Sequence, residues 1–241
     1  MRRIDMSNES VQNSLIGFWS SVAYAMCLVS LNISFVIMAI QVPAMDWQGI
    51  EVYSQTFQSI SFLPQVFGLA SIPAFILMLT SVHTNISKSR NLWSLAGLVF
   101  GTAFATLLGS LYFIQVAIVL PSLKDGTWGG LDQFAFANPQ SLAWGLNHFA
   151  WSLLGFSLLS IAWVFEGDGL NRWIKWLCVL NGLANISLIF SFTFRIEVLT
   201  LVIALLSWVI ALPSLSYLLA LWFRRNLTSV ENGSSELENI A

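Results

Sequence analysis

The sequence predicts an all-α fold: a polytopic transmembrane bundle of six helices with both termini in the cytoplasm. Hydrophobic residues make up 56% of the chain and charged residues only 9%, whereas a soluble domain carries about 25% charged residues. Six long stretches are almost free of Asp, Glu, Lys and Arg. About 20 apolar residues cross a bilayer as a helix, which satisfies its own backbone hydrogen bonds. Basic residues, finally, gather in alternate loops.

The first span is predicted at Leu15–Gln41, after a polar cytoplasmic tail of residues 1–14. This stretch is too long for the apolar region of a signal peptide, so we interpret it as a retained helix. The second span is predicted at Phe57–Val82 and contains Pro64 and Pro73. Each proline removes a backbone donor, so we expect a bend or free carbonyls there.

The third and fourth spans are predicted at Leu92–Leu120 and Pro139–Phe165. Asn138 is a good candidate for the N-cap of the fourth helix, and Pro139 suits a first turn, where no backbone donor is needed. The fifth and sixth spans complete one transmembrane domain of residues 15–226, before a disordered cytoplasmic tail of residues 227–241. They are predicted at Trp173–Thr193 and Val198–Phe223.

The positions of the basic residues predict the orientation. Eight of the ten Lys and Arg residues fall on the side of the termini, and only Lys124 and Arg195 fall on the other side. Short cytoplasmic loops carry the excess of positive charge, so the termini are predicted to be cytoplasmic. The eight are Arg2, Arg3, Lys88, Arg90, Arg172, Lys175, Arg224 and Arg225.

The two long outer loops resemble each other. Both carry a proline and then the pattern Trp-x-Gly-aliphatic-acid-x-aromatic, starting at Trp47 and at Trp128. A helical hairpin of residues 1–83 would then be repeated as residues 91–167, unless the apolar helices align by chance. The spacing of apolar residues such as Ile50 and Tyr53 also predicts a short helix in each loop, acting as an interfacial anchor or as a lid.

Polar side chains inside the spans are the candidates for a site, because such groups are costly in lipid. We predict that five of them contact a ligand in a cavity facing outward between the helices. The alternative is that these groups are interhelical hydrogen-bond contacts of about 0.6 kcal/mol each. The five are His148, Asn147, Gln65, Gln115 and Tyr112, of which His148 is the one histidine within a span.

Several function classes receive no support. No Asp, Glu, Lys or Arg lies deep in a predicted span, which argues against an ion-coupled transporter. The sequence offers no metal-ligand spacing, no hydrolase motif and no phosphate-binding loop, so it identifies no catalytic or metal-binding residue and leaves any cofactor unknown. A net charge of −2 without a large basic cluster argues against nucleic acid as a partner.

The middle of the chain resembles uncharacterised bacterial six-span integral membrane proteins. The resemblance rests on Tyr112-Phe113-x-Gln115, on Pro121, and on Asn138-Pro139-x-Ser141-x-x-Trp144. It implies a place in the bacterial cytoplasmic (inner) membrane, and it implies no activity.

The sequence leaves three functional hypotheses. The first is a protein that binds an apolar or amphipathic small molecule, as a carrier or sensor. The second is a structural or assembly subunit, and the third is a membrane-embedded enzyme that acts on lipid. The lipid bilayer is the predicted partner in each case, with a hydrophobic small molecule and a second copy of the chain as further candidates.

Overall fold

The computed structural model describes residues 2–42 and 46–238, with the side chains of residues 9–42, 46–196 and 198–228. Within this part, six helical runs are long and apolar enough to cross a membrane. This confirms the predicted helical bundle with six candidate spans. The runs are Glu9–Gln41, Ser59–Thr84, Lys88–Asp125, Leu142–Ala162, Leu170–Thr193 and Val198–Thr228.

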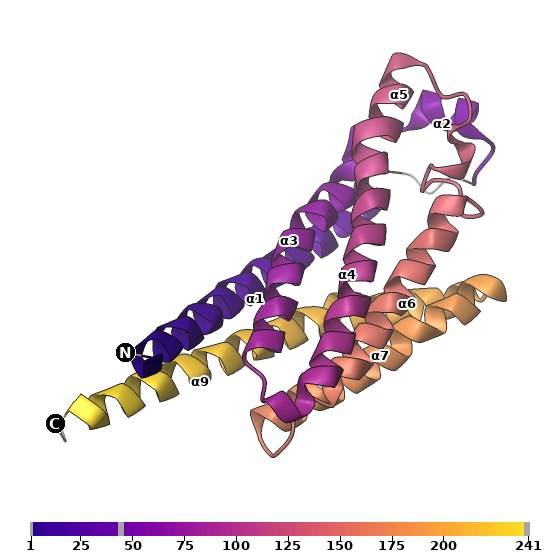
Figure 1. Cartoon of the computed structure of the whole chain (residues 1–241). Helices are drawn as coiled ribbons and strands as arrows, with labels where there is room; N and C mark the ends of the chain where they lie inside the picture. The colour runs from indigo at the N-terminus through magenta and orange to yellow at the C-terminus, as the bar shows by residue number, and fades with distance from the viewer. Residues whose placement is uncertain (1, 43–45, 239–241) are drawn as a thin grey trace.

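The long helices form a ring in chain order. Each packs against the next one, and the last packs against the first. The loops with α2 and α5 lie at one end of the bundle, and both termini lie at the other (Figure 1). The helices are α1 (Arg2–Gln41), α2 (Ile50–Thr56), α3 (Leu63–Thr84), α4 (Asn91–Ile114), α5 (Leu120–Asp125), α6 (Leu142–Ala162), α7 (Leu170–Thr193), α8 (Glu197–Ile203) and α9 (Leu212–Glu238).

Two π-helical segments join helices end to end. Gln115–Val119 connects α4 to α5, and Ala204–Ala211 connects α8 to α9. Each is followed within two residues by a proline, Pro121 or Pro213. A proline ring crowds the carbonyl four residues earlier, and the wider π turn accommodates it without ending the helix.

Two predictions from helix-end chemistry were wrong. Pro64 does not bend a helix, because it lies in the first turn of α3. Backbone N–H groups in the first turn have no carbonyl partner within the helix, so the proline removes no helical hydrogen bond. Asn138 does not cap α6, whose N-cap is Ser141, with its hydroxyl accepting from the Trp144 backbone at 3.2 Å. The Asn138 side chain instead accepts from the backbone N–H of Gln140 at 3.0 Å, which forms a turn before the helix begins.

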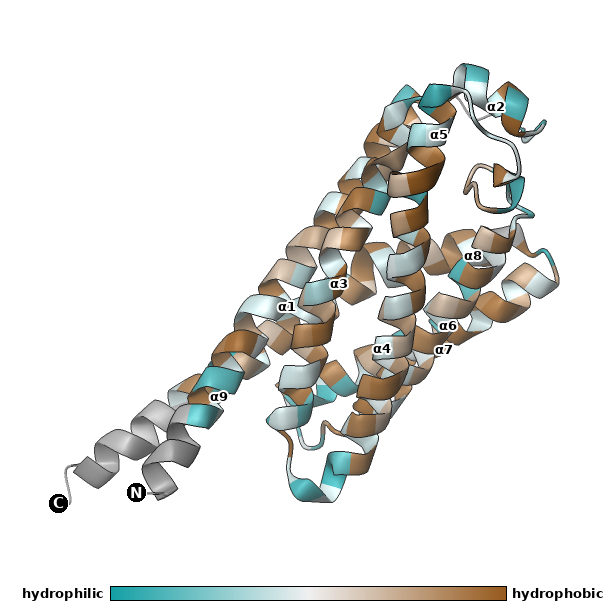
Figure 2. Ribbon diagram, turned by 45° about the horizontal axis from the view of Figure 1, so that its top comes forward, coloured by the Kyte–Doolittle hydropathy of each residue, from teal (hydrophilic) through white to brown (hydrophobic). Residues whose placement is uncertain are grey.

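The exposed residues along the helices are largely apolar, and Figure 2 shows the brown colour of apolar residues over much of each long helix. On α1, for example, Ile33, Val36 and Ile40 are 54%, 59% and 79% exposed. Soluble proteins rarely expose apolar surface that is so continuous. Exposed tryptophans lie near the end of the bundle that carries the two termini, as expected for an aromatic belt at a membrane interface. They are Trp93, Trp163, Trp173 and Trp176.

Small residues bring the helices into contact from the middle of the bundle to the end at which the termini lie. The Ser157 hydroxyl of α6 donates to the Gly97 carbonyl of α4 at 2.6 Å. A Cβ added at Gly155 would lie 2.6 Å from the Gly182 carbonyl oxygen, so α6 and α7 cross with their backbones in contact. Close crossings over small residues are typical of helices packed in lipid.

Candidate ligand-binding cavity

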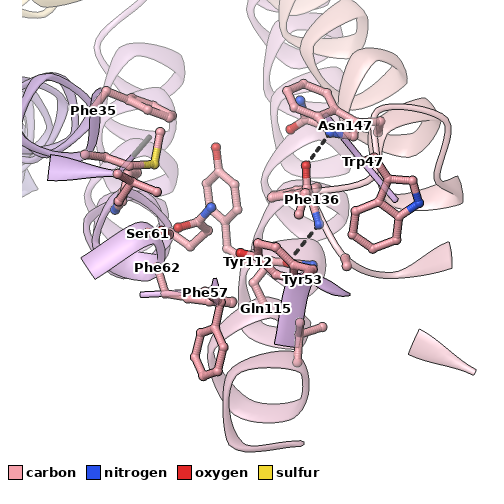
Figure 3. A pocket seen from close by; sticks show the side chains of 18 of the residues that line it. Phe35, Trp47, Tyr53, Phe57, Ser61, Phe62, Tyr112, Gln115, Phe136 and Asn147 are labelled. Carbon is pink, nitrogen blue, oxygen red and sulfur yellow. Dashed lines mark hydrogen bonds between the residues drawn. The ribbon is translucent and has the colours of Figure 1, made fainter. Parts of the chain in front are cut away.

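A cavity of about 480 Å³ lies inside the ring at the loop end. This volume falls in the range of small-molecule sites, about 300–1,000 Å³. Its wall comes from α1, α3, α4, α6, the π-helical segment before α9 and the two long loops. Most of the lining side chains are apolar or aromatic, and Figure 3 shows them around the open space.

A stacked tryptophan pair forms the floor of the cavity. The rings of Trp151 and Trp208 lie 4.6 Å apart at an angle of 28°. The Trp208 indole donates to the Asn185 side chain at 3.2 Å, and the Trp208 carbonyl accepts from Asn32 at 3.1 Å. The floor is therefore held by hydrogen bonds on the side away from the cavity.

Tyr112 enters the cavity from α4. Its ring packs against Gly68 of α3, where an added Cβ would come within 2.2 Å of the ring. The residue is only 7% exposed, and its hydroxyl has no hydrogen-bond partner among the described residues. Figure 3 shows the phenol pointing into the space between Phe35 and Asn147. The predicted site residue thus presents a free hydroxyl to the cavity.

Asn147 lines the opposite wall, on α6. It is 6% exposed, and its side-chain oxygen has no hydrogen-bond partner among the described residues. A buried acceptor without a partner costs about 1–3 kcal/mol. The geometry therefore provides a place for a hydrogen-bond donor that the chain itself does not supply.

Gln115 holds the wall together. Its amide nitrogen donates to the Phe134 carbonyl at 2.5 Å, and its amide oxygen accepts from the Phe136 backbone at 3.2 Å. The Trp144 indole also donates to the Phe136 carbonyl, at 2.7 Å. Gln115 lines the cavity as predicted, but both ends of its amide are bonded to the loop.

Gln65 lies near the start of α3 and also lines the cavity. Its amide, oriented to donate, gives hydrogen bonds to the carbonyls of Ser61 and Phe62 at 3.1 and 3.0 Å. These bonds fix the turn that leads into α3. Four of the five predicted residues therefore meet at one cavity.

His148 is not among the residues that line the cavity. It is 6% exposed, which confirms that it faces the interior. Its Nδ1 lies 2.8 Å from the Trp144 carbonyl oxygen, and its ring lies 4.9 Å from that of Phe192 on α7. Adjacent helical positions point about 100° apart, so Asn147 and His148 cannot face the same space.

The two long loops pack together over the cavity. The Asp132 carboxylate of the second loop accepts from the Ile50 backbone at 3.3 Å, at the start of α2. Ile50, Phe62 and Ala135 are buried in one apolar cluster between the loops. The short helix predicted in the first loop is present as α2, whereas the corresponding segment of the second loop, after α5, forms a 3₁₀ turn at Leu131–Gln133.

Tyr53 of α2 reaches from the loop into the cavity lining. Burial raises the pKa of its phenol above the ordinary value of 10.0. The phenol therefore stays neutral, and it adds no charge to the loops that cover the cavity. The repeat of the two hairpins stays a prediction, since its first proline, Pro43, lies outside the described residues.

A second group of polar residues lies beyond the floor and binds helices to one another. The Asn185 side chain donates to the Asn181 carbonyl and to the Ser207 hydroxyl, both at 2.8 Å. The Ser207 hydroxyl donates in turn to the Asn181 side chain. For this group the alternative of interhelical hydrogen bonding holds.

Sequence reasoning missed the floor and the wall contacts, namely Trp151, Trp208, Phe136 and Gly68. Nothing in their spacing separates them from packing residues. No group of three or more His, Cys, Asp or Glu side chains in the described part of the chain is placed to hold a metal ion.

No protein-family model, curated protein or solved structure matches the chain. The resemblance to bacterial six-span proteins stays a prediction.

Proposed function

We propose that this integral membrane protein binds an apolar or amphipathic small molecule in the cavity, as a carrier or sensor. The observation that carries the proposal is the unpartnered oxygen of Asn147 in a wall of mostly apolar and aromatic residues. Apolar pockets with a few converging polar groups are typical of small-molecule sites. A ligand that donates to Asn147 and fills the space would remove an unpaired buried group.

We propose further that the cavity faces away from the cytoplasm. Eight of the ten basic residues lie on the side of the termini, and the cavity lies at the other end (Figure 1). The positive-inside rule then places the termini in the cytoplasm. A bacterial cytoplasmic membrane is the location that we expect.

A structural or assembly subunit is the second candidate, and the network around Asn185 favours it. In that role a helix of a partner, or of a second copy, would fill the cavity. An enzyme acting on lipid would need His148 beside the loop acids, but its ring lies between Trp144 and Phe192.

Thermal unfolding in phosphatidylcholine nanodiscs tests the proposal. We expect 1-monodecanoylglycerol to raise the melting temperature saturably, because a ligand that binds only the folded state stabilises it. Ala39→Trp, at the cavity, should abolish the rise by filling the space. Ala103→Trp, on an exposed face of α4, is the matched control and should keep it.

Two outcomes would overturn the proposal. One is a wild-type protein that shows no saturable rise with 1-monodecanoylglycerol, decanol or decane. The other is an equal rise in the Ala39→Trp protein, which would place the binding elsewhere.

A further inference from the structure

Resting on this proposed function, we infer that the ligand is an uncharged lipid with a hydrogen-bond-donating headgroup. We infer also that it reaches the cavity from the bilayer, between α1 and α6. Three observations lead to this inference: the uncovered core face of α1, the charge of the lining, and the order of polar and apolar groups along the cavity.

The inward face of α1 loses its cover near the loop end. Tyr24, Leu28 and Leu31 follow helical spacing and are only 2%, 3% and 6% exposed. Phe35 is next on the same face, yet it is 39% exposed and lines the cavity. In the described chain α1 packs against α3, against α9 and against the π-helical segment Ala204–Ala211, which it meets at Asn32, and it has no extensive packing with α6.

The loops close the cavity in part and differ from this flank in polarity. Ile50, Phe62 and Ala135 are 6%, 4% and 1% exposed where the loops pack together. The bond between Asp132 and the start of α2 holds the same closure.

Val52 of α2 also lines the cavity and is as exposed as Phe35, at 39%. It lies near the exposed polar residues Gln48 and Thr56, however, whereas Phe35 lies beside the exposed apolar Val36. An apolar chain therefore meets apolar surface when it enters beside Phe35 and polar surface when it enters through the loops.

The charge of the lining selects against an anionic headgroup. The described lining residues include no Lys, Arg or His, and their one charged side chain is Asp46, which is exposed at the loop end. Moving a phosphate or carboxylate from water into an apolar site without a cation is strongly unfavourable. A cationic headgroup at the depth of Asn147 would equally lack a partner. A neutral hydroxyl or amide avoids both penalties and can donate to the Asn147 oxygen.

The order of the groups matches the direction of a lipid in the nearer leaflet. Asn147 lies five residues after the start of α6 at Leu142, about 8 Å along the helix axis. Trp151 is one turn deeper, beside Trp208, and Leu28 lines the cavity near it. A headgroup at Asn147 and Tyr112 would thus point toward the loops, with its chain along the apolar floor.

Ligands of equal chain length test the headgroup. In phosphatidylcholine nanodiscs, 1-monodecanoylglycerol should bind at least tenfold more tightly than decanoate, decyl phosphate or decylammonium. A charged ligand that binds as tightly as the neutral one would overturn the inference and leave the proposed function standing. Failure of every ligand to bind would instead remove the proposed function itself.

Spin-label accessibility tests the route. A nitroxide on Phe35→Cys, in a protein with Cys27→Ser, should collide more with oxygen from the bilayer than with a water-soluble nickel complex. A label on Gln48→Cys, in the exposed loop, should show the reverse and is the matched control. Preferential contact of the Phe35→Cys label with the nickel complex would mean entry from water and would overturn the route.

Discussion

Helices α4 and α6 meet in two different ways along their length. In the half of the bundle that carries the termini, the two helices touch directly, and the Ser157 hydroxyl donates to the Gly97 carbonyl. At the loop end the residue Phe136 stands between them, with its ring 6.1 Å from that of Tyr112 and 5.6 Å from that of Trp144. Glycine and serine bring the backbones together, whereas aromatic residues and an inserted loop keep them apart and leave a cavity.

The two regions also differ in the hydrogen bonds that a buried asparagine side chain makes. The Asn185 side chain is bonded at both its oxygen and its nitrogen, while the Asn147 oxygen has no partner among the described residues. Both residues are at least nine-tenths buried. Residue type and burial therefore do not separate a packing contact from a candidate site. An unpartnered atom alone does not do so either, because the Asn181 side-chain nitrogen in the network also has no partner among the described residues. Asn147 differs from Asn181 in that it lines the cavity.

Asn185→Leu should have the largest effect on stability. It removes four side-chain hydrogen bonds, to Asn181, Ser207 and Trp208. Two of these bonds, to Ser207 and Trp208, join α7 to the π-helical segment, at about 0.6 kcal/mol each. The Trp208 indole also loses its acceptor, and an unpaired buried donor costs about 1–3 kcal/mol, so we expect a loss of about 2 kcal/mol or more of unfolding free energy. Thermal or denaturant unfolding measures it. Asn171→Leu, which loses one exposed bond at the start of α7, is the control and should change little. Equal loss in both variants would contradict the network's role.

Gly68→Ala should have an intermediate effect and should act on the cavity. The new methyl would meet the Tyr112 ring at 2.2 Å, so the ring must move. Overpacking costs about 1–3 kcal/mol, partly offset by up to about 1 kcal/mol of better helix propensity. We expect lower stability and weaker binding of 1-monodecanoylglycerol.

Gly109→Ala on α4 is the matched control for this change. Its methyl would lie 3.6 Å from Ile72, an ordinary contact, so the gain in helix propensity should leave stability equal or higher. If Gly68→Ala behaved in the same way, Tyr112 would not be held against α3 as the structure has it.

The fold class was predictable because length and apolar character alone determine it. The four cavity residues on α3, α4, α6 and the π-helical segment after α4 were found because a polar side chain in lipid is unusual wherever it occurs. The position of His148 was not predictable in this way. His148 directly follows Asn147 on α6, so it points about 100° away from the cavity and packs against Phe192. Sequence periodicity does not show which side of a helix faces a neighbour and which faces a cavity. The N-cap of α6 was predicted wrongly for a similar reason. Asn138 and Ser141 are both good capping residues, and Asn138 is not the cap because its side chain forms hydrogen bonds within the loop.

Asn147→Leu should have the smallest effect on stability and the largest effect on binding. Leucine has the same number of side-chain heavy atoms as asparagine and the same branch at Cγ, its larger volume can extend into the cavity of about 480 Å³, and it removes an acceptor that has no partner. Replacing an unsatisfied buried polar group by an apolar one is neutral or stabilising, so the ligand-free melting temperature should stay equal or rise.

The same change removes the group to which the proposed headgroup donates. Binding of 1-monodecanoylglycerol should therefore weaken about tenfold, the equivalent of about 1.4 kcal/mol, while decane, which has no donor, should bind as before. Titration of the melting temperature with the two ligands measures both effects in one protein. A variant that loses stability as Asn185→Leu does would show that Asn147 is a packing contact, and the contrast between the two asparagines would then disappear.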